Sequence, residues 1–289
     1  MTLSVGAARA SELSAHYALC ETTLREKDRD SWLAALFAPS DRRRHLHAIR
    51  AFVVEIAEAR EKVTQPLLGE MRLRWWADTI EQASGANAHP VADALADTIS
   101  QNRLEPGEFL AFLDARVADF YDDRTVSVAA LLDYCGKADA LPLRWCALCL
   151  GEALGSDAGT ALEDAGAALG ITRVLWDLPR QGGARALLPA DLLHRHGVPA
   201  EDVEAGRDSR RLRAALAELR ALAREKLDSA RIAAPKLDEA ARGALLFAAA
   251  APLYLDRMER SDYQPFQPLP APSPWRRQWR LWRAARMGF

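Results

Sequence analysis

Three glutamates recur at a spacing of three residues: Glu55, Glu58 and Glu61. In a helix, residues three apart lie within reach of one another along one side. Such a stripe of carboxylates facing a cavity could hold hard divalent cations through oxygen ligands. Arg60 and Lys62 stand beside the stripe and could neutralise it. Composition alone favours this second interpretation, a solvated or salt-bridged helix face.

A further carboxylate, Asp177, ends a long apolar segment. An acid in that position needs a partner, because an unpaired buried charge costs free energy. Arg173 precedes it by four residues, one helical turn, and is the expected partner. The pair is either a structural ion pair or the remnant of a metal site, and the local sequence does not decide between them.

The elements that position these residues all have helical periodicity, and no stretch alternates with the period of two of a half-buried strand. The fold class is therefore predicted to be all-α. The predicted helices span approximately 11–27, 41–63, 66–82, 90–102, 105–120, 126–154, 157–178, 189–196, 209–232 and 237–260. The segments 126–154 and 157–178 are the most uniformly apolar and should be the most buried.

Two groups of residues are predicted to be core. Met71, Trp75 and Ile80 fall near one face of the helix predicted at 66–82, so core packing is the default interpretation. Cys146 and Cys149 form a CxxC without a second pair, within an apolar helical run, which favours buried cysteines over a metal or redox site.

The bulk composition bounds the class of protein. The chain has 289 residues, a formal net charge of −2 and four cysteines. This charge exerts no net attraction for nucleic acid, and four cysteines in a chain of this length do not suggest a disulfide framework. No signal peptide and no long uncharged apolar run are recognisable, so a cytoplasmic protein is expected.

The domain organisation is predicted as one helical domain at 1–263, a proline-rich linker at 264–274 and a basic tail at 275–289. Trp275, Trp279 and Trp282 are spaced at i, i+4 and i+7, flanked by arginines that include Arg276 and Arg280. The tail is an amphipathic basic helix. Either these five residues contact an anionic membrane surface, or the tryptophans dock onto the protein's own core while the arginines stay solvated.

The order of these motifs resembles the squalene/phytoene synthase family of trans-isoprenyl diphosphate synthases. The resemblance rests on Arg50-Ala51-Phe52 before the acidic helix, on Tyr134-Cys135, and on 166–177 followed by Leu187-Leu188-Pro189. It covers about 16–263 and implies one large all-α domain of the isoprenoid synthase type with a central cavity. In that family, two aspartate-rich motifs bind Mg²⁺ ions that hold the diphosphates of two prenyl substrates.

By this resemblance, both aspartate motifs are degenerate. The positions concerned are Ala57, Glu58 and Glu61 in the first motif, and Asp177, Arg180 and Gln181 in the second. The asparagine that the family places in the second motif falls on Arg173. Arginine competes with a cation for carboxylate and phosphate oxygens, so a magnesium cluster is disfavoured.

The remaining ligands that the resemblance implies form two reduced sets. A metal, if bound, would be held by Glu58, Glu61 and Asp177. A ligand or diphosphate would be bound by Arg50, Thr172 and Arg173. The polar mouth of the cavity would be lined by Arg50, Glu58, Glu61, Arg173 and Asp177.

The stretches 49–55, 68–76 and 188–198 are similar to a divergent branch of the family that includes assembly factor 6 of respiratory complex I. This similarity implies a non-catalytic protein at the cytoplasmic face of the inner membrane. Its partners would be complex I subunits or assembly intermediates, a prenyl or lipid-like ligand and an anionic membrane surface, but no nucleic acid.

The alternative is an enzyme, an active head-to-head prenyltransferase of the squalene or phytoene synthase type. It would use farnesyl or geranylgeranyl diphosphate and would need Mg²⁺, whereas the non-catalytic interpretation needs no cofactor. Convergence of further carboxylates on the cavity, such as Asp119 or Asp139, would favour the enzyme.

Overall fold

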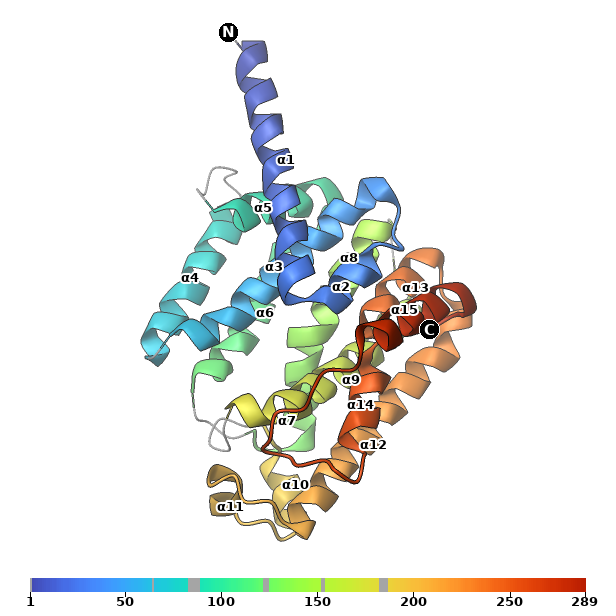
Figure 1. Ribbon diagram of the computed structural model, residues 1–289. Coiled ribbons are helices and arrows are strands. Elements are labelled where there is room, and N and C mark those ends of the chain that lie inside the picture. The colour runs from blue at the N-terminus through green and yellow to red at the C-terminus, as the bar shows by residue number, and fades with distance from the viewer. Residues whose placement is uncertain (1, 64, 83–88, 122–124, 152–153, 182–186) are drawn as a thin grey trace.

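The computed structural model describes residues 2–63, 65–82, 89–121, 125–151, 154–181 and 187–289 (Figure 1). The side chains of 2–8, Glu61 and Gln181 lie outside the described part. Within these ranges every regular element is a helix, which confirms the predicted all-α class. None of the helices described is both long and apolar enough to cross a membrane.

The helices follow one another through the chain with short connections. Their bounds are α1 Thr2–Lys27, α2 Arg29–Ala35, α3 Ser40–Lys62, α4 Pro66–Gln82, α5 Pro90–Asn102, α6 Pro106–Val117, η1 Ala118–Phe120, α7 Val128–Cys135, η2 Gly136–Ala140, α8 Leu141–Leu150, α9 Ser156–Gln181, α10 Ala190–Arg195, α11 Ala200–Glu204, α12 Arg210–Ala233, η4 Ala234–Lys236, α13 Glu239–Leu245, η5 Leu246–Ala248, α14 Ala251–Met258 and α15 Pro274–Met287.

Two helices predicted as continuous are divided. The segment predicted at 126–154 contains α7, the π-helical turn η2 and α8, and the break coincides with Gly136 and Pro142. The segment predicted at 237–260 contains α13, the 3-10 turn η5 and α14, and Pro252 lies in the first turn of α14. Proline has no N–H to donate and its ring clashes with the preceding turn, so an α-helix restarts at proline more readily than it continues through it.

The core consists of two apolar clusters. The first joins α3, α5, α6, α8 and α13, and the second surrounds α9, α12 and α14. Helices α8 and α9 lie in the interior, as predicted for the two apolar segments. Cys146 and Cys149 in α8 are free and buried, and burial raises the pKa of Cys146 to about 12, which confirms their prediction as core cysteines.

The predicted core face of α4 is wrong in part. Ile80 is buried, but Met71 is 60% exposed and Trp75 is 39% exposed. The buried face is set instead by Leu73 and Trp76, together with Ile80. Leu73, Trp76 and Ile80 are spaced by three and four residues, as expected for one helix face. Trp75 precedes Trp76 by one position, and this single step places it outside the buried face.

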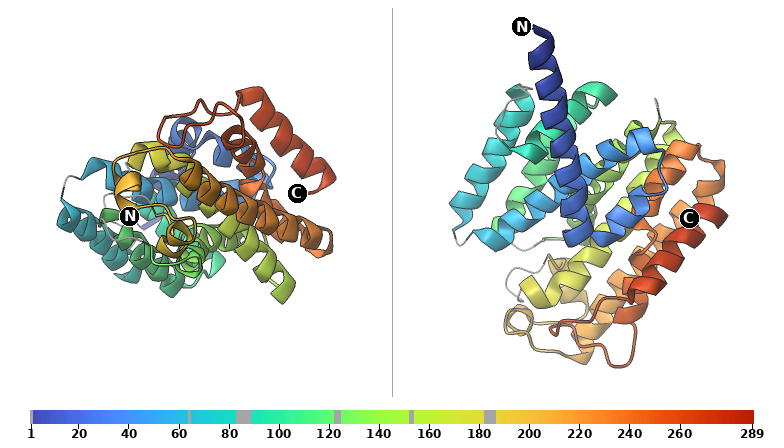
Figure 2. Two further views of the ribbon diagram at one scale, coloured as in Figure 1. Left: turned by 90° about the horizontal axis from the view of Figure 1, so that it is seen from below. Right: turned by 45° about the horizontal axis from the view of Figure 1, so that its top comes forward.

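The proline-rich segment is packed rather than free. Within 264–274, Pro265 and Pro272 are buried. The segment leads to α15, which packs against α2 and η5 on the body of the molecule (Figures 1 and 2). The predicted extended linker therefore does not separate the tail from the domain.

Candidate functional site

A buried polar network lies where α6, α7, η2 and α9 meet. The hydroxyl of Tyr134 donates to Asp119 over 2.7 Å and accepts from Arg116 over 3.0 Å. Arg116 also forms an ion pair of 2.9 Å with Asp119. On the other side, Arg173 donates to Asp139 over 2.8 Å and its guanidinium lies 5.6 Å from the centre of the Tyr134 ring. Two arginines, two aspartates and one tyrosine thus form a single cluster.

The close approach of η2 to α9 brings Asp139 to Arg173. At Gly166 and Gly170, both in α9, a Cβ atom would overlap with Ala140 and with the side chains of η2 and α7. Glycine is required at both positions because only a missing side chain leaves room for the neighbouring backbone. These two glycines therefore allow η2 to approach α9 closely enough for Asp139 to reach Arg173.

The charges in this network are balanced. Burial lowers the pKa of the Arg116 guanidinium, but the Asp119 carboxylate, together with Tyr134 and Asp139, outweighs this effect and the pKa is raised overall. Asp139 raises the pKa of Arg173 in the same way. Burial raises the pKa of Tyr134, so its hydroxyl stays protonated. Each carboxylate is thus committed to a permanently charged arginine, which competes with any metal ion for the same oxygens.

Asp119 and Asp139, the further carboxylates whose convergence would favour an enzyme, do meet in this network, but together with two arginines. Asp119 and Asp139 both contact the same cluster, but each does so as the partner of an arginine. Among the residues that the structure describes, no group of three or more histidine, cysteine, aspartate or glutamate side chains could hold a metal ion. Within this network, the carboxylates of Asp119 and Asp139 therefore serve as ion-pair partners.

The first of the two motifs predicted to be degenerate lies on α3. Ala57 offers no oxygen ligand, and Glu58 accepts from both Lys27 and Lys62 at 2.7 Å. The neighbouring Glu55 is bound by Arg72 at 3.0 Å. The side chain of Glu61 lies outside the described residues, so the predicted metal set of Glu58, Glu61 and Asp177 stays a prediction.

The protonation of Glu58 follows from these contacts. Partial burial raises its pKa, but hydrogen bonds from Lys27 and Lys62 outweigh this effect and lower the pKa below its ordinary value of 4.5. A lowered folded-state pKa stabilises the fold at pH values above the unfolded pKa, and this contribution is lost as pH falls through the folded value.

We expect the Glu58→Gln variant to lose less than about 1 kcal/mol at pH 7, because the pair is largely solvated. The difference between wild type and variant should decrease as the pH falls below the ordinary pKa of 4.5 and should vanish once the pH is below the lowered folded-state pKa. Urea unfolding at several pH values measures both quantities. A loss that persisted undiminished in acid would contradict the ion-pair interpretation.

In the second motif predicted to be degenerate, the ion pairs differ from the prediction. Arg173 bonds to Asp139 rather than to Asp177, and Asp177 instead pairs with Arg180 at 3.3 Å. Long side chains of a helix point back toward its N-terminus, so Arg173 extends away from Asp177. The predicted Arg173–Asp177 pair is wrong for this reason. The side chain of Gln181 lies outside the described residues.

Two other predicted ligand-binding residues have structural partners. Arg50 is buried and donates to Ser31 over 3.0 Å and to Asp28 over 3.1 Å, at the start of α2. The Thr172 hydroxyl donates to the carbonyl of Ala168 in the preceding turn. Both polar groups thus have partners within the protein. That Arg50, Thr172 and Arg173 bind a ligand or a diphosphate stays a prediction.

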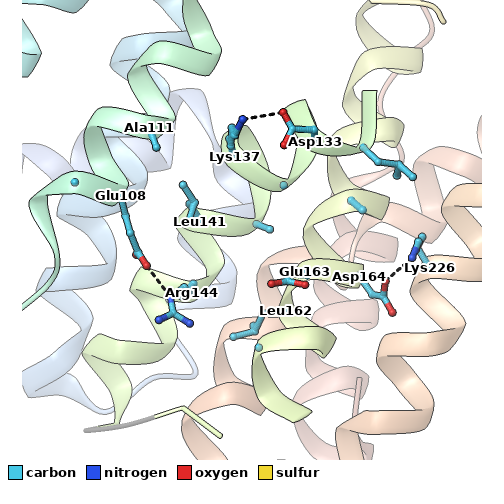
Figure 3. Close-up of a pocket in the computed structure, with 16 residues that line it drawn as sticks. Glu108, Ala111, Asp133, Lys137, Leu141, Arg144, Leu162, Glu163, Asp164 and Lys226 are labelled. Carbon is cyan, nitrogen blue, oxygen red and sulfur yellow. Dashed lines mark hydrogen bonds and ion pairs between the residues drawn. The ribbon is translucent and has the colours of Figure 1, made fainter. Parts of the chain in front are cut away.

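A pocket of about 570 Å³ lies between α6, α8, α9 and α12 (Figure 3). Glycines and alanines of η2, α6 and α9 form much of its surface. Its rim carries three ion pairs, Glu108–Arg144, Asp133–Lys137 and Asp164–Lys226. None of the predicted site residues lines it. Three of its four acids are paired, and the fourth, Glu163, forms no ion pair with any residue that the structure describes. The pocket can therefore receive a ligand or a partner's side chain.

Sequence reasoning missed the basic residues that neutralise the acids: Lys27, Arg72 and Arg116. The spacing of Arg116 and Asp119, three residues apart, could have indicated the last of these. The other two contacts join α1 and α4 to α3, and no local pattern signals them.

The C-terminal helix has two different faces. Leu281 and Ala284 are buried, Arg277 pairs with Asp30 at 2.8 Å, and Arg280 donates to the carbonyl of Ala249 over 3.0 Å. The exposed fractions are 81% for Trp275, 62% for Trp279 and 41% for Trp282. The alternative in which the tryptophans dock onto the core is therefore wrong.

Of the five residues predicted to contact a membrane, Arg280 is no longer a candidate, because it contacts the body of the protein. Its guanidinium is occupied by a backbone carbonyl of the body. Trp275, Trp279, Trp282 and Arg276 all face outward.

A family model described as squalene/phytoene synthase matches residues 24–283, and so extends into the tail. NADH dehydrogenase (ubiquinone) complex I, assembly factor 6, of Rattus norvegicus is 28% identical over 271 residues, 92% of this chain and 80% of that protein. Phytoene synthase 2, chloroplastic, of Solanum lycopersicum is 26% identical over 264 residues, 88% of this chain and 84% of that protein. The crystal structure of squalene synthase HpnC from Alicyclobacillus acidocaldarius matches with a TM-score of 0.73 at 21% identity, covering 89% of this chain and 97% of that one. Since the family model spans most of the chain and the helices superimpose, the chain belongs to the squalene/phytoene synthase family and has its all-α isoprenoid synthase fold.

Proposed function

We propose that this chain is a non-catalytic member of its family that assists the assembly of respiratory complex I. The observation that carries the proposal is the Arg173–Asp139 ion pair, with Arg116 and Asp119 beside it. It places fixed positive charge beside the two further carboxylates, Asp119 and Asp139, whose convergence would otherwise favour the enzyme. The similarity to complex I assembly factor 6 supports the choice of partner, namely complex I subunits or assembly intermediates.

The protein is proposed to act as a peripheral protein at the cytoplasmic face of the inner membrane. The outward-facing tryptophans of α15 support this location, because aromatic rings flanked by arginines suit the headgroup region of a bilayer. The function is then one of binding, with a prenyl or lipid-like molecule as the ligand of the helical domain.

The alternative, an active magnesium-dependent prenyltransferase, is favoured by one observation. Tyr134, Asp119 and Asp139 meet in the interior of a fold shared with squalene synthase HpnC. If the arginines were displaced on substrate binding, these oxygens would become available to a metal.

Turnover distinguishes the two proposals. The purified protein is incubated with farnesyl or geranylgeranyl diphosphate, Mg²⁺ and NADPH, and the extracted lipids and released diphosphate are analysed by mass spectrometry. We expect no product above a protein-free control, because the acids are neutralised by arginine. Formation of squalene, phytoene or a related alcohol by the folded protein would establish the enzyme instead.

Assembly is tested in cells. Deletion of the gene in the source organism should lower NADH:ubiquinone oxidoreductase activity and the amount of intact complex I on native gels. Succinate dehydrogenase activity serves as the matched control and should not change. A normal level of complex I in the deletion strain would refute the assembly role, whatever the turnover assay shows.

A further inference from the structure

A groove of about 860 Å³ lies beside the last turns of α15. Its walls come from the α2–α3 turn, the end of α12, α13 and the C-terminal residues, which meet on one side of the molecule (Figure 1). We call it the C-terminal groove. Arg231, Arg242 and Arg286 line it, with Glu239 as an acidic residue in the wall.

The charge around this groove is incompletely compensated. Arg231 pairs with Asp228 at 2.8 Å, and Arg286 lies 5.5 Å from the centre of the Trp282 ring. Arg242 is exposed and forms no ion pair with any residue that the structure describes. Positive charge therefore remains on the groove wall after the internal contacts are counted.

A second group of arginines adds to this charge. Burial lowers the pKa of Arg280, and repulsion from the neighbouring charges of Arg231 and Arg283 lowers it further. Arginines that repel one another at short range are stabilised by an anion placed between or beside them.

The same edge of the molecule is also apolar. Phe37 and Met287 line the groove and are 44% and 72% exposed. On the adjacent face of α15, the rings of Trp279 and Trp282 stack with their centres 5.0 Å apart. A soluble anion would satisfy the arginines but would leave these side chains in water. A phospholipid satisfies both groups, because its phosphate is anionic and its chains are apolar.

We propose that the C-terminal groove seats the phosphate of an anionic phospholipid between Arg242 and Arg286, with Phe37 and Met287 against its acyl chains. The tryptophans of α15 then lie at the bilayer interface beside the bound lipid. This inference rests on the membrane contact in the proposed function and names the lipid class that the contact recognises.

Vesicle binding by the full chain tests the inference. The wild type and variants are titrated with vesicles of phosphatidylcholine alone and of phosphatidylcholine mixed with phosphatidylglycerol, and tryptophan emission and co-sedimentation are measured. The groove variant combines Arg242→Gln with Arg286→Gln. The matched control combines Arg276→Gln with Arg283→Gln, which removes two charges from the same region outside the groove lining.

If the arginines are attracted only diffusely to an anionic surface, the affinity for anionic vesicles should fall about fivefold for each arginine removed, in either variant. If the groove arginines donate hydrogen bonds to a lipid phosphate, the groove variant should lose at least about ten times more affinity for anionic vesicles than the control variant. Both variants should keep the melting temperature of the wild type, because the substituted side chains are exposed. Equal losses in the two variants would overturn the groove and leave the membrane contact in place.

A substitution among the tryptophans of α15 distinguishes the proposed membrane contact from the proposed lipid site in the C-terminal groove. Trp279→Ala should weaken binding to both vesicle types, since the ring contacts the interface irrespective of lipid charge. If the wild type bound neither type of vesicle, both the groove and the membrane contact would be refuted. The assembly role would then still be decided independently by the level of complex I in the deletion strain.

Discussion

The Arg116→Ala variant is expected to lose about 3–5 kcal/mol of folding free energy, because it leaves the Asp119 carboxylate buried without its ion-pair partner. Arg116 is 6% exposed and Asp119 is 5% exposed, so water cannot easily replace the guanidinium. Tyr134 would also lose the hydrogen bond that it accepts from Arg116. Denaturant unfolding at neutral pH gives the loss directly.

The control for this experiment is Arg74→Ala. Arg74 pairs with Asp78 over 2.9 Å, but its side chain is 75% exposed. Exposed pairs of this kind contribute roughly 0–1 kcal/mol, so the control should unfold almost like the wild type. If both variants lost the same small amount, the network would have to be hydrated, and its carboxylates would again be candidates for metal binding.

The same substitution, glycine to alanine, should have opposite effects at two positions of α9. At Gly166 a Cβ atom would overlap with the backbone and side chain of Ala140, so Gly166→Ala is expected to cost about 1–3 kcal/mol. At Gly159 nothing lies within 4 Å of the position of a Cβ, so Gly159→Ala should be stabilising by up to about 1 kcal/mol through its helix propensity.

Thermal unfolding of the two variants, measured in parallel, checks this prediction. A lower melting temperature for Gly166→Ala and an unchanged or higher one for Gly159→Ala are the expected results. A stabilising effect at both positions would mean that η2 is free to move away from α9. The Asp139–Arg173 contact would then not be held by packing.

These two predictions bear on function as well as stability. The Arg173–Asp139 pair is the feature that argues against a working magnesium site, and it exists because η2 lies close to α9. A rigid network keeps the arginine among the carboxylates. Stability measurements on Arg116 and Gly166 therefore test the physical basis of the non-catalytic proposal without requiring an activity.

The all-α class, most helix positions and the family could all be predicted from the amino-acid sequence. Helical periodicity is a local property, because residues three and four apart share a face whatever the rest of the chain does. Proline and glycine positions are local signals as well, although Gly136 and Pro142 were not used to divide the segment at 126–154. Burial of the cysteines in α8 followed from the apolar run that contains them.

Only the tertiary structure decided which charges pair. Arg173 could reach Asp177 by spacing alone, but side-chain direction and the approach of η2 give it Asp139. Likewise, the tryptophans of the tail face outward because Leu281 and Ala284, with Arg277, occupy the contact with the body. Both outcomes depend on contacts between segments far apart in the chain, and such contacts leave no periodic signal in the sequence.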